Sequence, residues 1–208
     1  MADDTLVLAT RNPGKLRELS RILGGQVRLT GLDSFPGAPD VPETGATFEE
    51  NALIKARAIA RHTGLPAVAD DSGLCVDALN GMPGVLSARW AGRHGDDQAN
   101  LDLVLAQMAD VPDARRGAQF VCAAALVAPR AGAREWVVTG QVAGRLTREP
   151  RGSGGFGYDP IFLPDGFTQT TAEMTAEAKD AISHRGRAFR ALAPFIVALA
   201  GGPAAAVP

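Results

Sequence analysis

Residues 5–25 read TLVLATRNPGKLRELSRILGG, and the pattern changes at the centre of this stretch. Thr5–Ala9 is a short apolar run typical of a strand, whereas apolar residues recur at helical spacing after Pro13. This helical face consists of Leu16, Leu19, Ile22 and Leu23. Gly24-Gly25 is typical of a helix end. The stretch therefore predicts a strand, a tight turn and a helix.

The rest of the chain continues this mixture of strands and helices. Thr47-Phe48-Glu49-Glu50 has the capping-box pattern and predicts a helix that runs to Gly64. Strands are predicted at Ala67–Asp70 and Leu74–Asp77, and a further helix at Asp97–Met108. The remaining predicted elements are a hairpin of Ala118–Ala128 and Glu135–Val142, a strand at Ile161–Leu163, and C-terminal helices interrupted near Gly186 and Pro194. Together they predict an α/β domain with a mixed sheet.

Composition limits the class of protein. The chain has 208 residues, of which 46% are hydrophobic and 21% charged, so it can bury a substantial core within one domain. The formal net charge is −2 and the pI is about 5.9, whereas nucleic-acid-binding domains are usually basic. We therefore expect no nucleic-acid partner, and any phosphate site should be local.

The two ends and the cysteines give further expectations. Met1–Asp4 carries acid where a signal peptide would carry Lys or Arg, and no apolar run approaches a membrane span, so we expect a cytoplasmic protein with no membrane partner. Cys75 and Cys122 are expected to be buried thiols. We expect one domain over residues 1–200 and a flexible tail over residues 201–208.

The first turn carries the first candidate site. Thr10-Arg11-Asn12-Pro13-Gly14-Lys15 leaves the predicted strand and opens the helix, with Asn12 as N-cap and Pro13 at the first helical position. The backbone N–H groups and Lys15 together suit an anion. The alternative is an ordinary capped helix with a solvated lysine. The segment is not a Walker A loop, because Leu16 follows Lys15 where Ser or Thr is required.

The second candidate site is acidic. Glu43 lies in Pro42-Glu43-Thr44-Gly45, and Asp70-Asp71-Ser72-Gly73 is predicted at the carboxyl end of an apolar strand, where α/β sheets bind ligands. Mg²⁺ prefers one or two carboxylates together with phosphate oxygens, which makes these acids candidates. The alternative for Asp70–Gly73 is a turn in which Asp caps backbone N–H groups.

Two polar residues lie on the helix between these acids, and one of them, Lys55, is a weaker candidate. Asn51 and Lys55 are four residues apart, opposite the predicted apolar face. Lys55 could face the same phosphates as the first turn. Solvated lysines on polar helix faces are far commoner, so this hypothesis is weak by itself.

A glycine-rich loop forms the third candidate site. Gly152–Pro160 satisfies the G-x-G-x-x-G pattern, but a dinucleotide fingerprint needs a strand before it and a helix after it. Arg148–Arg151 precedes it and Asp159-Pro160 with a short strand follows, so we reject that interpretation. Phe156 could instead stack on a purine base. The alternative is a core phenylalanine in a flexible loop.

The fourth candidate site lies near the C-terminus. Ser183-His184-Arg185-Gly186 follows Lys179, which is four residues before Ser183 on a predicted helix. Arginine can donate a pair of hydrogen bonds to the carbonyl edge that a 6-keto purine offers and a 6-amino purine lacks. The alternative is that His184 and Arg185 are caps or surface charges.

Taken together in order, these segments resemble one family, the non-canonical purine NTP pyrophosphatases, also called inosine/xanthosine triphosphate pyrophosphatases. The resemblance covers nearly the whole chain. It rests on Thr10, Asn12 and Lys15 in a T-x-N-x-x-K pattern, Glu43-Thr44-Gly45, Glu50-Asn51-Ala52 with Lys55, Ala69–Leu74, Gly155–Pro160 and Ser183–Gly186.

The resemblance implies a fold and a set of residue roles. The implied fold is a single two-lobed α/β domain around a long central mixed sheet flanked by helices, with the active-site cleft between the lobes. Mg²⁺ as cofactor and a homodimer are also implied. Asp71 is implied as the proton acceptor, with Glu43 and Asp71 as metal ligands. The triphosphate is implied to bind near Thr10, Arg11, Asn12, Pro13, Gly14, Lys15, Lys55 and Ser72. The base is implied to bind near Phe156, Gly157, Tyr158, Asp159, Lys179, His184 and Arg185.

The expected activity is hydrolysis of ITP, dITP and XTP to the monophosphate and pyrophosphate, which removes deaminated purines from the nucleotide pool. An enzyme of the related Maf type, acting on pyrimidine or modified nucleotides, is one alternative. Such an enzyme would be expected to have a Ser/Pro/Arg-rich first loop, whereas the first loop of this chain is Asn/Pro/Gly/Lys. A non-catalytic nucleotide sensor is another, but it would not need Glu43, Asp70 and Asp71 together. The acidic pI argues against a third, direct binding of nucleic acid.

Overall fold

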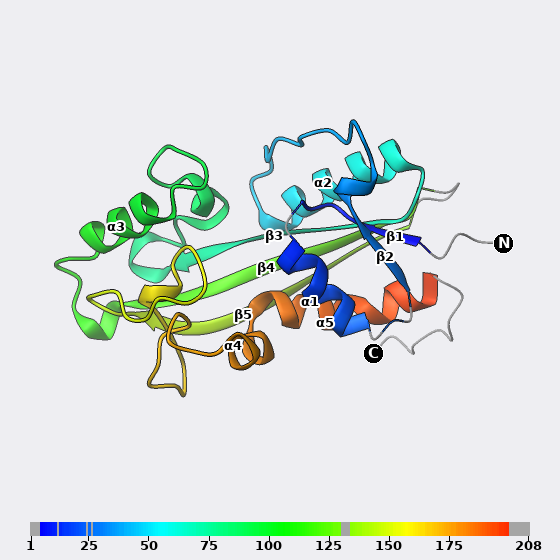
Figure 1. The fold of residues 1–208 in the computed structure, drawn as a ribbon. Helices are drawn as coiled ribbons and strands as arrows, with labels where there is room; N and C mark the ends of the chain where they lie inside the picture. The colour runs from blue at the N-terminus through cyan, green and yellow to red at the C-terminus, as the bar shows by residue number, and fades with distance from the viewer. Residues whose placement is uncertain (1–4, 12, 24, 26, 130–133, 200–208) are drawn as a thin grey trace. The chain divides into compact units, whose positions relative to one another are not determined.

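The computed structural model describes residues 5–11, 13–23, 25, 27–129 and 134–199. Its sheet has six strands in the order β2-β1-β3-β4-β5-β6. The strands are β1 (Thr5–Leu8), β2 (Arg28–Gly31), β3 (Ala67–Val76), β4 (Gly117–Val127), β5 (Glu135–Leu146) and β6 (Phe162–Pro164). The α-helices are α1 (Pro13–Leu23), α2 (Phe48–Thr63), α3 (Asp97–Gln107), α4 (Ala176–Ile182) and α5 (His184–Leu199) (Figure 1).

The sheet is mixed, as the sequence predicts. β1 pairs in parallel with both β2 and β3, and β5 pairs antiparallel with β6. The chain forms two compact units. Unit 1 comprises residues 1–71, 122–140 and 185–208, and unit 2 comprises residues 72–121 and 141–184. The strands β3, β4 and β5 each contribute residues to both units.

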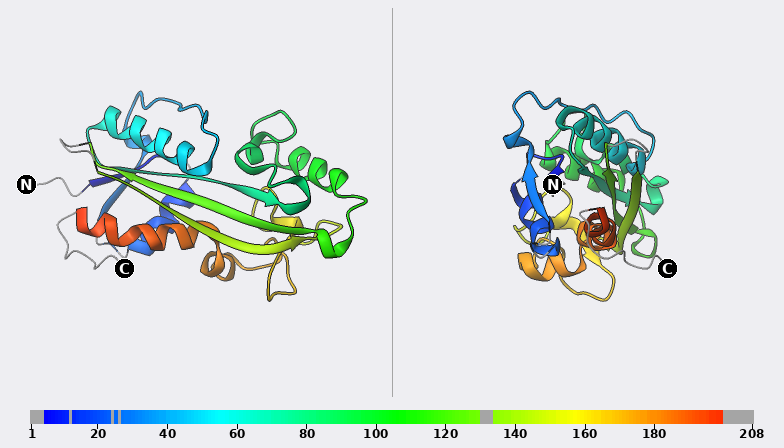
Figure 2. Two further views of the ribbon diagram at one scale, coloured as in Figure 1. Left: turned by 180° about the vertical axis from the view of Figure 1, so that it is seen from behind. Right: turned by 90° about the vertical axis from the view of Figure 1, so that its right-hand side faces the viewer.

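Unit 1 is a layered α/β arrangement. Its helix α2 lies on one face of the sheet, and α1 and α5 lie on the other (Figures 1 and 2). The core between the sheet and these two helices includes Leu19 and Leu23 of α1 and Phe189, Leu192 and Ile196 of α5. The predicted apolar spacing of the first helix therefore corresponds to a buried face.

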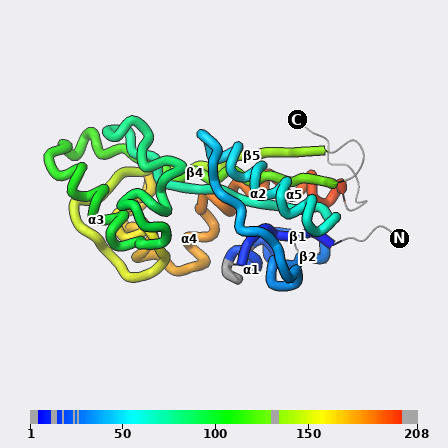
Figure 3. Tube along the Cα trace, turned by 90° about the horizontal axis from the view of Figure 1, so that it is seen from above, coloured from blue at the N-terminus to red at the C-terminus, as the bar shows by residue number. Residues whose placement is uncertain are grey.

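The first strand and helix follow the sequence prediction, but the next strand does not. The helix begins at Pro13, whose missing N–H costs nothing in the first turn. The sequence pattern predicts no strand at the residues of β2, which pairs with β1 from Thr5↔Arg28 to Leu8↔Gly31. β2 has four residues and none of them is fully buried, so its sequence lacks the alternation of apolar and polar residues that predicts a strand. Residues 35–46 then lead the chain to α2 (Figure 3).

The start and end of α2 are fixed by local chemistry. The Thr47 hydroxyl accepts a hydrogen bond from the Glu50 N–H, which is one half of the predicted capping box. The Glu50 carboxylate accepts from the N–H of Ala46 rather than from that of Thr47. The helix ends at Gly64, whose φ of 70° favours glycine.

Unit 2 has a separate core. Leu101 and Val104 of α3, and Met108 directly after it, pack with strand residues and with Tyr158 of the glycine-rich segment. Tyr158 is buried, and its hydroxyl donates to the Ser87 carbonyl at 2.8 Å. The glycine-rich segment is therefore anchored at this end to the unit 2 core.

Two predictions about element boundaries are wrong. Asp70 and Asp71 do not lie at the carboxyl end of a strand: they lie in the middle of the ten-residue β3. Partners from elsewhere in the chain compensate their buried charge, so a turn is not required. The C-terminal helix also is not interrupted near Gly186 or Pro194, because α5 contains both, and the break lies at Ser183. Gly186 lies in the first turn, and burial of Leu192 and Ile196 offsets the hydrogen bond that Pro194 cannot donate.

One buried cation of unit 2 donates hydrogen bonds to three backbone carbonyls. The guanidinium of Arg116 is 2% exposed and donates to the carbonyls of Met108, Leu146 and Thr147 at 2.6–3.0 Å. Arg116→Met removes these charge-assisted bonds, so we expect the free energy of unfolding to fall by about 2–3 kcal/mol. Urea unfolding measures this change, with Arg115→Met at the exposed neighbouring position as the control. Equal loss in both variants would contradict the assigned role.

Candidate active site

A buried ion-pair cluster surrounds Asp70 in unit 1. Both carboxylate oxygens of Asp70 accept from the Lys15 ammonium at 2.8 Å, and Oδ2 also accepts from the Arg185 Nε at 3.1 Å. Burial opposes the charged form of Asp70, but Lys15 and Arg185 outweigh it and hold the pKa of this carboxyl well below its usual range. Asp70 is therefore a fixed anion, and its lone pairs are committed to two cations.

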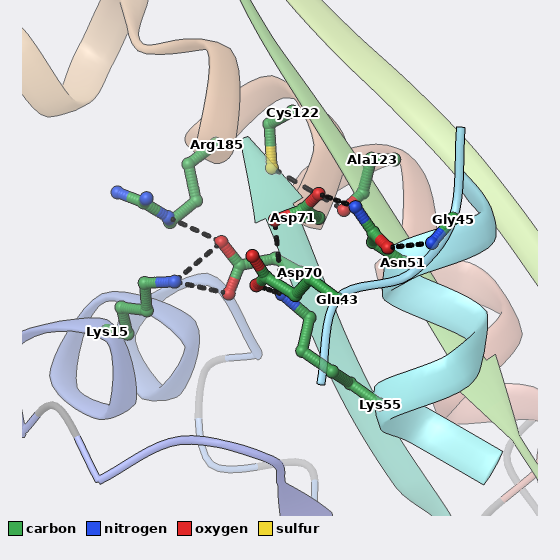
Figure 4. Close-up of polar contacts among 10 residues, drawn as sticks. All are labelled: Lys15, Glu43, Gly45, Asn51, Lys55, Asp70, Asp71, Cys122, Ala123 and Arg185. Atoms are coloured by element: carbon green, nitrogen blue, oxygen red, sulfur yellow. Dashed lines mark hydrogen bonds and ion pairs between the residues drawn. The ribbon is translucent and has the colours of Figure 1, made fainter. Parts of the chain in front are cut away.

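A second cluster, which we call the acid–lysine cluster, consists of Glu43, Lys55 and Asp71 (Figure 4). The Lys55 Nζ lies 2.7 Å from Glu43 Oε1 and 3.1 Å from Asp71 Oδ1. Burial disfavours the charged lysine, but the charges of Asp71 and Glu43 outweigh burial and raise its pKa. Burial raises the pKa of Asp71, Lys55 lowers it in part, and the charge of Glu43 adds to the rise. Asp71 is therefore a stronger base than an ordinary aspartate.

The amide of Asn51 adjoins the acid–lysine cluster. Asn51 is fully buried, and its Nδ2 donates to Asp71 Oδ2 at 3.0 Å. Its Oδ1 accepts from the Gly45 N–H at 2.8 Å. Asn51 and Lys55 are one helical turn apart on α2, so both reach the same carboxylate from one helix face.

The donor set of the acid–lysine cluster suits a hard divalent cation. The carboxylates of Glu43 and Asp71 already converge on one positive group, the Lys55 ammonium. Within the described part of the chain, no group of three or more His, Cys, Asp or Glu side chains is placed to hold a metal by itself. Mg²⁺ commonly binds one or two carboxylates and completes its coordination with water and substrate phosphate. Glu43 and Asp71 fit that arrangement.

The predicted phosphate loop is described only in part. Asn12 lies outside the described residues, and so does its predicted capping role. Lys15 reaches Asp70 of the second candidate site. Arg11 instead pairs with the exposed Asp40 at 2.6 Å and donates to the Ala38 carbonyl. Ser72 follows Asp71 directly in β3. Thr10 lies between β1 and α1, and Pro13 and Gly14 are the first two residues of α1.

The predicted base-binding residues of unit 2 are organised by Asp159. This carboxylate is 3% exposed and accepts from the Phe156 N–H, the Thr171 hydroxyl and the Lys179 ammonium. The Gly157 N–H donates to Asp97 at 3.0 Å. Asp159 therefore holds the glycine-rich segment and Lys179 together.

Two aromatic contacts accompany this network. The Phe156 ring is 61% exposed, which excludes the alternative of a core phenylalanine. The Lys179 ammonium lies 5.0 Å from its centroid, a cation–π distance. His184 stacks on Phe120 with 4.9 Å between centroids and 13° between planes. Phe156 thus offers an open aromatic face.

Comparison with known proteins assigns the family. The model of the Ham1 family matches residues 6–195. The chain belongs to the Ham1 family. A relative named dITP/XTP pyrophosphatase from Streptomyces coelicolor is 64% identical over 94% of this chain and 98% of its own length. One of the same name from Nocardia farcinica is 61% identical over 94% of this chain and 96% of its own length.

Solved structures of Ham1 family members confirm the fold. The crystal structure of the nucleoside-triphosphatase, dITP/XTP pyrophosphatase from Mycobacterium abscessus is 61% identical, covers 90% of this chain and 98% of its own, and has a TM-score of 0.77. The Ham1 protein of Staphylococcus aureus is 38% identical, covers 94% of this chain and 99% of its own, and has a TM-score of 0.85. The α/β class and the resemblance stated from the sequence are thereby confirmed.

Sequence reasoning missed two features of unit 1. It assigned Asn51 no role, although the amide contacts Asp71. It left the role of Asp70 open and did not connect it with Arg185, whose Nε donates to Asp70 Oδ2. The contact of Arg185 with the base stays a prediction. The four-residue spacing of Asn51 and Lys55 was the available signal, since two polar residues on one helix face can converge on one partner.

Proposed function

We propose that this chain hydrolyses non-canonical purine nucleoside triphosphates, namely ITP, dITP and XTP, to the monophosphate and pyrophosphate. Its curated relatives named dITP/XTP pyrophosphatase include chains 56–64% identical over nearly their whole length. The observation that carries the proposal is the acid–lysine cluster: a buried aspartate of raised pKa within hydrogen-bond distance of a lysine and near a second carboxylate. Such perturbed, paired groups are typical of catalytic sites.

In the proposed mechanism, Asp71 acts as the general base. Its carboxylate accepts a proton from water, the water oxygen bonds to the α-phosphorus, and the bond from that phosphorus to the α,β-bridging oxygen breaks. Pyrophosphate leaves with the electron pair of that bond. Lys55 and Lys15 contribute positive charge against the triphosphate. Mg²⁺, held by Glu43 and Asp71, would neutralise charge on the phosphate oxygens.

We further propose that the unit 2 residues select the base. Phe156 offers an exposed ring for stacking, and Lys179 and His184 lie in the same unit as donors. Donors that pair with the O6 of a keto purine would meet an amino group in ATP and stay unsatisfied, which can give up to about 10⁴-fold discrimination. Tyr158 and Asp159 hold the glycine-rich segment in place through their buried hydrogen bonds.

Several expectations stay part of the proposal. These are Mg²⁺ as the metal, a homodimer, a cytoplasmic location and a catalytic domain that spans residues 1–200. The predicted tail over residues 201–208 lies outside the described residues. None of the helices in the described ranges is long and apolar enough to cross a membrane.

The test is pyrophosphate release from ITP, dITP, XTP, ATP, GTP and UTP at equal concentration, with Mg²⁺ and with EDTA. We expect keto-purine analogues to turn over at least about 100-fold faster than ATP, because a mismatch leaves buried donors unpaired. EDTA should abolish release. A preference for UTP would favour the Maf-type alternative, and an absence of turnover on every nucleotide would favour the nucleotide sensor.

A further inference from the structure

The orientation of the Asn51 amide is determined by its two partners. The Gly45 N–H can only donate, so Asn51 must turn its oxygen toward it. The ionised carboxylate of Asp71 can only accept, so the Asn51 nitrogen must face Asp71 Oδ2. The amide of an asparagine carries a donor and an acceptor on one planar group and satisfies both, which accounts for a polar side chain at a position with no solvent exposure.

The same side chain connects the two carboxylates of the acid–lysine cluster. Gly45 is two residues after Glu43, so the Asn51 oxygen holds the segment that presents Glu43. Its nitrogen holds Asp71, whose other oxygen is held by Lys55. Figure 4 shows Asn51 between Gly45 and Asp71, with Lys55 between Glu43 and Asp71. Glu43 and Asp71 are therefore linked twice through α2.

The backbone at Gly45 packs tightly against Glu50 and Asn51 of α2. A Cβ at this position would lie 2.6 Å from the Glu50 Cβ and 2.9 Å from Asn51 Oδ1. Both distances are shorter than side chains tolerate, so the glycine permits the backbone to approach Asn51 closely enough for the hydrogen bond. The segment that carries Glu43 is held against α2 at this point.

We propose that Asn51 is a positioning residue that fixes the spacing and orientation of the Glu43 and Asp71 carboxylates for a divalent cation and for proton transfer. This inference rests on the proposed function. A displacement of about 1 Å at such a site weakens both metal binding and catalysis, because supporting hydrogen bonds keep ligands at productive distances.

The test compares Asn51→Leu with Asn100→Leu. Asn100 is 1% exposed on α3, and its Oδ1 also accepts a backbone N–H, that of Ala91, but it lies outside the acid–lysine cluster. Mn²⁺ affinity is measured by electron paramagnetic resonance, alone and with α,β-imido-ITP, and kcat and KM for ITP are measured at saturating Mg²⁺. We expect Asn51→Leu to weaken Mn²⁺ binding and lower kcat, each about tenfold or more, with KM changed far less.

Asn100→Leu should lower the melting temperature but leave kcat and Mn²⁺ affinity at wild-type values. If Asn51→Leu behaves in the same way, Asn51 serves folding only and the inference is overturned. If Asn51→Leu does not fold, Gly45→Ala tests the same link without changing Asn51, and it should also weaken Mn²⁺ binding. Wild-type Mn²⁺ affinity in Gly45→Ala overturns the inference. Failure of the wild-type protein to hydrolyse ITP would reject the proposed function instead, and the Mn²⁺ comparison would still report on Asn51.

Discussion

Asp71→Asn should lower kcat for ITP by about 10³-fold, because general-base catalysis is worth about 10²–10⁴-fold and the amide cannot accept the proton. The substitution keeps the shape of the side chain, and an amide oxygen can still accept from Asn51 Nδ2. The fold should therefore survive, and circular dichroism with thermal melting checks this. Asp102→Asn, at an exposed position of α3, is the control that should keep kcat. Retention of most of the wild-type kcat in Asp71→Asn would remove Asp71 from the catalytic role.

The pH dependence of wild-type activity provides a second measurement on Asp71. Burial raises the pKa of this carboxyl, with the charge of Glu43 adding to the rise, so the basic form is present only above that raised value. Activity should be lost as pH falls through a pKa above the ordinary value of about 3.9. Protons and Mg²⁺ compete for a metal-binding carboxylate, so raising Mg²⁺ should move this acid limb to lower pH. An acid limb that Mg²⁺ does not move would contradict metal binding by Asp71.

The sequence predicts the local parts of unit 1 because their causes are local. The apolar spacing of Leu19 and Leu23 corresponds to a buried helix face, and Gly64 ends α2 through its own backbone preference. By contrast, Asp70 and Asp71 read as a turn but lie within β3. The buried charge of Asp70 is compensated by Lys15, 55 residues away in sequence, and by Arg185, 115 residues away. No local pattern reports such partners.

In the candidate site too, contacts between residues distant in sequence could not be predicted from local patterns. Glu43 and Asp71 are candidates from their segments, but their pairing as metal ligands could be assigned only through the resemblance to a family, since nothing in the separate segments shows that Lys55 connects them. Asn51 is the clearest omission. Its character as a polar residue on a helix predicts solvent exposure, whereas it is fully buried because two specific partners satisfy its amide.

Asp70→Asn should lower the free energy of unfolding by about 3–5 kcal/mol at pH 7, which is the usual cost of removing one partner from a buried ion pair. The loss is large because the Asp70 side chain is 3% exposed while that of Arg185 is only 10% and that of Lys15 only 24% exposed, so solvent replaces little of the lost attraction. Equilibrium urea unfolding measures the change. Asp40→Asn, which removes the exposed partner of Arg11, is the matched control and should have little effect.

The pH dependence of this difference distinguishes charge from packing. Lys15 and Arg185 outweigh burial and hold the pKa of Asp70 below its unfolded value of about 3.9. A carboxyl with a lowered folded-state pKa stabilises the fold above the unfolded pKa, and that contribution is lost as pH falls below it. The gap between wild type and Asp70→Asn should therefore be constant from pH 7 to about pH 5 and should narrow below about pH 4. If the difference between wild type and Asp70→Asn stays constant into acid, the charge of Asp70 does not stabilise unit 1. Its contribution would then come from the shape of the side chain and from hydrogen bonds that a neutral carboxyl also makes.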